Sequence, residues 1–283
     1  MKSTIQFQLS RIKANLAVFL ILVVIGILVV YTGYLHQSVK QAIAYLTVMV
    51  FSAFLIDFST HNKPSGTEFS VRNPRKESGY FLLTVVLGSV FLYFRFLAPV
   101  DWNHQNLWIK LAVLPCILFV FPVGLAIIML LLKYKPADMG IRLQGLWIAV
   151  PIIFLSAITN HFVSPKSLTW NAMMAEGGSI AGTLFTGLIV AGLSEEFFRV
   201  VGQTRIGALC KNYGMGWIIT TVIWAFMHAP KWYMEEKDIQ DAVLGSIRII
   251  PIGLMWGYLT HRTKSILPSV LVHGTNFWGL QNF

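Results

Sequence analysis

The amino-acid sequence predicts an all-α, polytopic membrane protein: a transmembrane helical bundle that encloses a polar cavity within the membrane. Of its 283 residues, 55% are hydrophobic and only 12% are charged. The mean hydropathy is +0.65, and long apolar runs recur from one end of the chain to the other. This composition excludes an ordinary soluble globular domain of the same length.

The apolar runs predict eight or nine membrane spans, because a helix needs about 20 apolar residues to cross a hydrocarbon core of about 30 Å. The count is left open because the seventh and ninth runs are short. The sixth run can continue past Arg205 as one long helix. The predicted spans centre on residues 15–35, 42–58, 79–100, 107–133, 145–163, 179–200, 214–230, 243–260 and 265–282.

The basic residues are interpreted as topology signals. The net charge is +10, but lysine and arginine occur in short patches between apolar runs and form no continuous stripe for nucleic acid. With a cytoplasmic N-terminus, most of them fall on the cytoplasmic side, Arg199 and Arg205 included, as the positive-inside rule requires. Without a transit or retention signal, the chain is expected in a bacterial inner membrane.

Two loops and two cysteines complete the outline. Residues 59–78 are rich in Pro, Gly, Ser and basic residues and predict a mobile cytoplasmic loop, whereas the acidic residues 229–241 predict an external loop. Cys116 and Cys210 have neither metal-site spacing nor a disulfide framework, so both are interpreted as packing residues.

Two carboxylates and an arginine interrupt the sixth apolar run, in the stretch LSEEFFR. Each ionisable side chain at bilayer depth costs roughly 2.5 to 3.5 kcal/mol, so this cluster needs partners and water. On a helix, Arg199 can pair with Glu195 four residues away or with Glu196 three residues away. The other carboxylate then remains available as a base. The alternative is an ion-paired staple between helices with no catalytic role.

Two histidines and an asparagine add to this polar set. His228 ends the seventh run, in WAFMHAP, where a capping or interfacial histidine is the alternative reading. His273 lies in the last predicted span, three residues before Asn276, so both side chains share one helix face. Their alternative role is hydrogen bonding between helices. Taken together, a base, two imidazoles and a carboxamide on three spans suit water-activated acyl transfer.

The stretch from about 179 to 280 resembles the CAAX prenyl protease and bacteriocin-processing family of intramembrane proteases, which includes type II CAAX proteases and lysostaphin-resistance-protein-A-like domains. That family carries a Glu-Glu pair followed by Arg, an aromatic residue four positions before a His, and a His followed by Asn or Asp. The matching residues here are Glu195, Glu196 and Arg199, then Trp224 and His228, then His273 and Asn276.

The resemblance divides the chain into two expected parts. Residues 1–135 form an N-terminal transmembrane region of no recognised family, and residues 136–283 form a CAAX-protease-like transmembrane domain with its motif core at 179–280. Residues 137–143, read as ADMGIRL, resemble the lead-in that precedes the core in many members.

Two spacings depart from the family pattern. EEFFR and HGTN each have two residues between their polar positions, where the family usually has three. Aligned from Arg199, the family's second Glu falls on Glu195 and its first on Ser194. The sequence therefore leaves open which glutamate is the base.

The resemblance implies a role for each motif residue. Glu195 or Glu196, with His228, would activate water; Arg199 would orient the carboxylates; His273 and Asn276 would stabilise the oxyanion. No cofactor is required on this reading. A zinc ion held by Glu195, Glu196, His228 and His273 is the alternative, disfavoured because the chain lacks the His-Glu-x-x-His spacing of zinc proteases.

The expected function is thus an intramembrane endopeptidase that acts on a membrane-associated substrate, such as a prenylated or bacteriocin-like peptide. Its expected partners are that substrate and the lipid bilayer, with no nucleic acid, and the oligomeric state is left open. The rivals are a protease-like adaptor or immunity protein without activity, and a proton-coupled transporter, which should show a repeat symmetry that this chain lacks.

Overall fold

The computed structural model describes residues 2–60, 69–97, 107–108, 111, 116–117, 122–163, 179–276 and 279–283. Within these residues every regular element is a helix, so the all-α prediction is confirmed. Five helices are long and apolar enough to cross a membrane. They do not confirm the predicted eight or nine spans: the fourth predicted span lies partly outside the described residues, and the ninth contains a helix of only eight residues.

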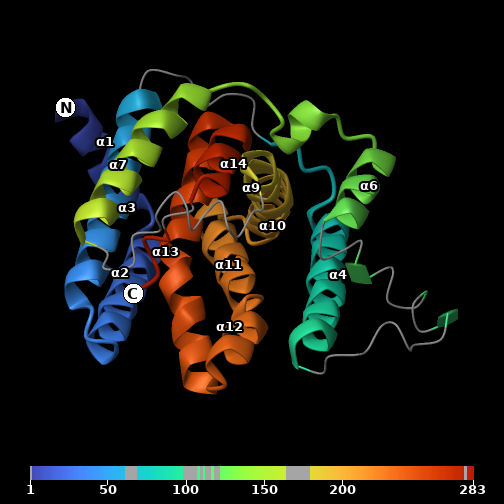
Figure 1. The fold of residues 1–283 in the computed structure, drawn as a ribbon. Helices are drawn as coiled ribbons and strands as arrows, with labels where there is room; N and C mark the ends of the chain where they lie inside the picture. The colour runs from blue at the N-terminus through green and yellow to red at the C-terminus, as the bar shows by residue number, and fades with distance from the viewer. Residues whose placement is uncertain are drawn as a thin grey trace.

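The N-terminal part supplies three of these five helices (Figure 1). The apolar helices α2 and α3 form a hairpin, and both pack against α13. The elements of this part are α1 (Lys2–Ala14), α2 (Leu16–Leu35), α3 (Val39–Thr60), α4 (Pro74–Leu92), which continues as the π-helix η1 (Tyr93–Leu97), and α6 (Val123–Leu131).

Two short 3₁₀ turns lead from α6 into the next long helix. They are η2 (Pro136–Met139) and η3 (Leu146–Ile148), and the helix is α7 (Ala149–Val163). Gly140 and Gly145 both have a positive φ, 84° and 75°, a conformation that glycine adopts without strain. Residues 136–163 are therefore a pair of tight turns before a helix long and apolar enough to span a membrane.

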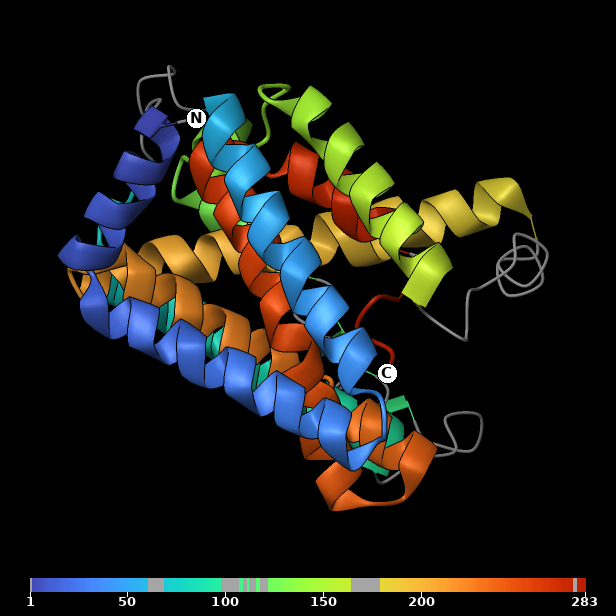
Figure 2. The same ribbon diagram turned by 90° about the vertical axis from the view of Figure 1, so that its left-hand side faces the viewer.

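A single helical rod carries the glutamate pair. It runs without a break from α9 (Ile180–Phe185) through the π-helix η4 (Thr186–Leu193) into α10 (Ser194–Leu209), and Figure 2 shows it crossing the other helices. The prediction that the sixth run continues past Arg205 is confirmed. The rod ends where Lys211 takes a left-handed conformation with φ 52°.

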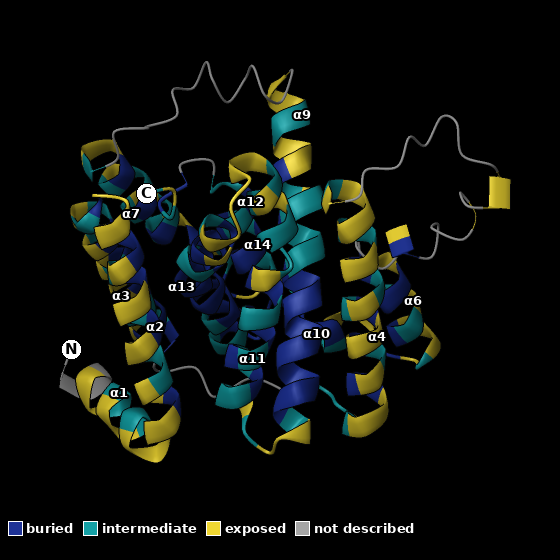
Figure 3. Ribbon diagram, turned by 90° about the horizontal axis from the view of Figure 1, so that it is seen from below, coloured by how far each residue is buried: buried dark blue, intermediate teal, exposed yellow. Residues whose placement is uncertain are grey.

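Helix α10 lies in the core, with α4 on one side and α11 on the other (Figure 3). Its two arginines, which were counted with the basic residues of the cytoplasmic loops, lie inside the packed bundle. Arg199 is 1% exposed and Arg205 is fully buried. Both are buried because the rod continues through the packed bundle and each guanidinium meets a carboxylate there.

The partner of Arg205 comes from the N-terminal region. The Arg205 Nε lies 3.1 Å from Glu77 Oε2, and the Tyr134 hydroxyl donates to Glu77 Oε1 across 2.8 Å. Burial, together with the hydrogen bond to the Glu77 carboxylate, raises the pKa of the Tyr134 phenol. This ion pair joins the first turn of α4 to the last turns of α10.

A second network joins α1 and α3 to the C-terminal end of α13, the end that was predicted to be cytoplasmic. Asp57 is buried, pairs with Arg262 across 3.0 Å and accepts a hydrogen bond of 2.5 Å from Tyr258. Arg11 of α1 donates to the same Tyr258 hydroxyl. Of the two free cysteines, Cys116 is buried, whereas Cys210 is exposed, so the interpretation of Cys210 as a packing residue is wrong.

The C-terminal part folds as α11 (Tyr213–Phe226), α12 (Ala229–Glu236), α13 (Ile239–Thr263) and α14 (Leu267–Gly274). The predicted acidic loop at 229–241 is wrong, since most of it is α12. Pro230 starts that helix, because proline is well tolerated in a first turn. Asp238 then caps α13 by accepting from the backbone N–H of Gln240.

Candidate active site

The first turn of α10 places the two glutamates in different surroundings. Glu196 is 1% exposed and pairs with Arg199 one turn later. The Arg199 guanidinium also donates to the Gly253 carbonyl across 2.5 Å. Its carbon atom lies 4.8 Å from the Trp224 ring and 5.0 Å from the Trp256 ring. Arg199 thus contacts two aromatic rings and a backbone carbonyl, and Glu196 is its counter-ion.

Glu195 is the accessible carboxylate of the pair. Its side chain is 29% exposed, and its Oε2 accepts a hydrogen bond of 2.6 Å from the Trp224 indole. Trp224 lies on α11, the helix most extensively packed against α10. The sequence allowed Arg199 to pair with either glutamate. In the structure it pairs with Glu196, and the Glu195 side chain remains accessible to water.

His228 lies at the junction of α11 and α12 and faces Glu195. Its Nδ1 is 2.9 Å from the Trp224 carbonyl oxygen, one helical turn earlier. A carbonyl oxygen can only accept, so Nδ1 carries the proton and the neutral ring presents the Nε2 lone pair. That Nε2 lies 3.9 Å from Glu195 Oε2.

His273, near the end of α14, contacts both glutamates. Its Nδ1 is 2.9 Å from Glu196 Oε1, and its Nε2 is 3.7 Å from Glu195 Oε2. The carboxylate accepts, so Nδ1 carries the proton here as well. Close packing of α14 on η4 supports this placement: a Cβ on Gly274 would meet the Gly187 carbonyl at 2.7 Å.

One oxygen of Glu195 therefore faces the Nε2 atoms of two histidines. All three atoms are acceptors, and separations of 3.7 and 3.9 Å exceed a direct hydrogen bond. A polar contact of this length suits a bridging water, whose O–H groups can donate to a carboxylate and to an imidazole. Chemically, the arrangement can polarise one water molecule and accept its proton.

Asn276 is the predicted site residue that the described contacts leave apart from the cluster. Helix α14 ends at Gly274, so Asn276 does not share a helix face with His273 as predicted. Its backbone N–H closes a turn on the His273 carbonyl, and its side-chain amide lies 3.4 Å from Gln281 Oε1. Its expected role as an oxyanion donor stays a prediction.

The predicted four-ligand zinc set is not assembled among the described side chains. No group of three or more His, Cys, Asp or Glu residues in this part of the chain is arranged to hold a metal ion. Glu196 in particular faces Arg199 and the protonated Nδ1 of His273. Both contacts fall on Glu196 Oε1, and its Oε2 is buried without a hydrogen-bond partner among the described residues.

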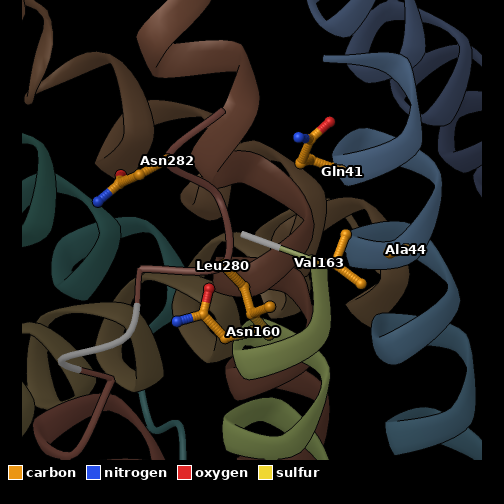
Figure 4. Close-up of a pocket in the computed structure, with 6 residues that line it drawn as sticks. All are labelled: Gln41, Ala44, Asn160, Val163, Leu280 and Asn282. Carbon is orange, nitrogen blue, oxygen red and sulfur yellow. The ribbon is translucent and has the colours of Figure 1, made fainter. Parts of the chain in front are cut away.

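A small pocket elsewhere in the bundle is separate from this cluster (Figure 4). It opens between α3, α7 and the C-terminal segment, and none of the predicted site residues lines it. Its lining residues are Gln41, Ala44, Asn160, Val163, Leu280 and Asn282.

Comparison with known families identifies the segment that contains the cluster. Residues 177–278 match the family described as type II CAAX prenyl endopeptidase Rce1-like. We call this matching segment, residues 177–278, the Rce1-like domain. The predicted resemblance is confirmed for this segment, which includes every residue of the cluster. No curated protein and no solved structure matches the chain.

Two tryptophans of the Rce1-like domain are part of the cluster, and the sequence interpretation gave neither a role. Trp224 binds Glu195, and Trp256 stacks on His273. Trp224 and His228 are one helical turn apart, so both lie on one face of α11. Both face Glu195. Trp256 lies in an apolar stretch of α13, and no local pattern distinguishes it from a core residue.

Proposed function

We propose that this protein is an intramembrane endopeptidase that hydrolyses a peptide bond in a membrane-associated substrate, such as a prenylated CAAX peptide or a bacteriocin-like peptide. The observation that carries the proposal is the position of Glu195 Oε2 between the Nε2 atoms of His228 and His273. The family of the Rce1-like domain supports the reaction class.

Glu195 is the base in this proposal. Its carboxylate accepts one proton of a bound water, and the resulting hydroxide attacks the scissile carbonyl carbon. His228 Nε2 accepts a hydrogen bond from the second O–H and so orients the water. When the C–N bond breaks, the protonated Glu195 returns its proton to the leaving amine, which regenerates the carboxylate.

Glu196 and His273 serve the oxyanion that forms on the carbonyl oxygen. In this proposal His273 takes up one proton from bulk water before the reaction and keeps it through the cycle, so that its Nδ1–H stays bonded to Glu196 and its Nε2–H donates to the oxyanion. The negative charge of Glu196 stabilises this imidazolium. Asn276 is the expected second donor, and Arg199 keeps Glu196 ionised and in place. Hydrogen-bond donors aimed at a developing oxyanion typically contribute about 100- to 1,000-fold in rate.

A cleavage assay tests the proposal. Purified full-length protein in detergent is incubated with a library of peptides, including farnesylated CAAX peptides, and products are detected by mass spectrometry. We expect cleavage by the wild type and none by Glu195→Gln. The matched control is Glu235→Gln on α12, where an exposed glutamate pairs with Lys231 and has no ion pair with a cluster residue among the described contacts. Absence of any cleavage by the wild type would instead favour a protease-like adaptor.

We also propose a cytoplasmic N-terminus in a bacterial inner membrane. The support is the excess of basic residues on that side of the predicted loops and the apolar helices of the bundle. A cysteine introduced at Lys76, an exposed position in the first turn of α4, tests the orientation. We expect no reaction with a membrane-impermeant thiol reagent in intact cells, and labelling from outside would contradict it.

A further inference from the structure

Trp256 of α13 is stacked on the imidazole of His273. The ring centroids are 3.9 Å apart and the ring planes differ by only 14°. The indole is 2% exposed and ranks among the largest fully buried side chains. His273 therefore has a flat aromatic surface against one face and a carboxylate at its Nδ1.

The same indole also lies against Arg199. The guanidinium carbon is 5.0 Å from the Trp256 ring, and Arg199 donates to the carbonyl of Gly253, one turn earlier on α13. Trp256 thus contacts both residues that pair with Glu196. Trp256 on α13 therefore contacts Arg199 on α10 and His273 on α14, the two residues that bind the buried Glu196 carboxylate.

The bond to Glu196 fixes only one atom of the His273 ring. A ring held at Nδ1 alone can still tilt about that contact, and a tilt carries Nε2 away from Glu195. A parallel stack opposes such a tilt, because aromatic rings lose contact area and favourable geometry when their planes diverge. The bond and the stack together define the direction of Nε2.

A purely packing role does not account well for a tryptophan at this position. The Trp256 indole N–H is buried and has no hydrogen-bond partner among the described residues. A buried donor without a partner destabilises the fold, and a leucine would fill an apolar site without that penalty. The stack on His273 gives the ring a role that compensates for it.

We propose that Trp256 is a positioning residue that sets the plane of His273 and so directs its Nε2 toward Glu195. This inference rests on the proposed endopeptidase function. Trp256 touches neither the bound water nor the scissile bond in this account; it acts through His273 alone. A phenylalanine at 256 preserves a stacking surface, whereas a leucine removes it.

Kinetics of three variants test the proposal, with full-length protein in detergent and a fluorogenic peptide ending in a farnesylated CAAX sequence. For Trp256→Leu we expect kcat to fall about tenfold with KM within about twofold of the wild type, since the lost interaction positions a group used in the transition state. For Trp256→Phe we expect kcat to return to near the wild-type value and thermal stability to equal or exceed it.

Trp217→Leu is the matched control. Trp217 lies at the same α11–α13 interface, donates to the Leu254 carbonyl across 2.9 Å and packs against Gly257, but has no contact with His273. This variant should lose stability while the kcat of its folded fraction is unchanged. A wild-type kcat in Trp256→Leu, or an equal loss in Trp217→Leu, overturns the proposal.

A spectroscopic measurement separates this proposal from the proposed function. In protein labelled with ¹³C at histidine Cε1, the His273 signal is identified by its loss in His273→Asn. We expect the signal to be displaced upfield by the indole ring current in the wild type, to remain upfield in Trp256→Phe and to move downfield in Trp256→Leu. An unmoved signal in Trp256→Leu overturns the inference even if Glu195→Gln abolishes cleavage. A moved signal with cleavage intact in Glu195→Gln supports the placement of His273 and refutes the peptidase mechanism instead.

Discussion

His273 donates a hydrogen bond from its Nδ1–H to Glu196 across 2.9 Å. This bond decides which ring nitrogen faces Glu195. Residue 273 lies on α14 and residue 196 on α10, so the contact also joins the two ends of the Rce1-like domain. Glu196 carries two cationic or proton-donating partners, whereas Glu195 keeps an exposed oxygen. We therefore expect substitutions at the two glutamates to have different effects.

Glu196→Gln should destabilise the protein as well as impair catalysis. The substitution leaves Arg199 buried without its counter-ion, and breaking a buried pair in this way costs about 3 to 5 kcal/mol. A lower melting temperature in detergent is the measurement. The control, Glu235→Gln, breaks an exposed pair with Lys231 and should cost less than about 1 kcal/mol. Equal melting temperatures for the two variants would count against the buried pair.

His228→Phe should lower kcat with little effect on stability. The phenyl ring can retain the edge contact with Trp224, but it cannot accept a hydrogen bond from water. Loss of an acid–base group typically lowers the rate about 100- to 10,000-fold. Steady-state kinetics together with thermal unfolding check both halves of the expectation. An active His228→Phe enzyme would remove His228 from the mechanism.

Much of the fold could be predicted from the sequence, because apolar runs of sufficient length specify membrane helices without reference to the rest of the chain. The long rod through Arg205 is one confirmed example. The burial of Arg205 could not be predicted, since its partner Glu77 lies 128 positions away. The helix at 229–236 was missed because the acidic composition of residues 229–241 was interpreted as a loop, although Pro230 in a first turn starts a helix.

The residues of the site could be predicted from the sequence, but the contacts between them could not. Helix periodicity allows Arg199 to meet either glutamate, so the choice depends on a tertiary contact. That contact is His273, 77 positions from Glu196. The position of Asn276 depends on where α14 ends, and helix ends are the least certain part of a sequence interpretation. Trp256 carries no polar signal at all.

Glu77→Gln should destabilise the fold while leaving the chemistry intact. Glu77 accepts from Tyr134 and pairs with Arg205, so its loss leaves a fully buried guanidinium without a counter-ion. The expected cost is again about 3 to 5 kcal/mol. The fraction of folded protein, measured by size-exclusion chromatography, should fall, whereas kcat per folded molecule should be unchanged. A change in kcat alone would instead tie this ion pair to the active site.

Chelation should leave the activity unchanged. On our account Glu195 and His228 activate the water without a metal ion, and no group of three or more His, Cys, Asp or Glu among the described residues is arranged to hold one. Cleavage of the fluorogenic peptide is measured before and after dialysis against 1,10-phenanthroline. Activity that disappears and returns on addition of zinc would establish the metal alternative.

The central claim is that Glu195 is the base that activates water, and Glu195→Gln tests it most directly. The amide preserves the shape of the side chain and can still accept the 2.6 Å hydrogen bond from Trp224 through its oxygen, but it cannot take a proton from water. The measurement is turnover of the farnesylated CAAX peptide by purified protein whose melting temperature matches that of the wild type. We expect turnover to fall to the background of the uncatalysed reaction. Turnover at the wild-type rate in this variant would contradict the account.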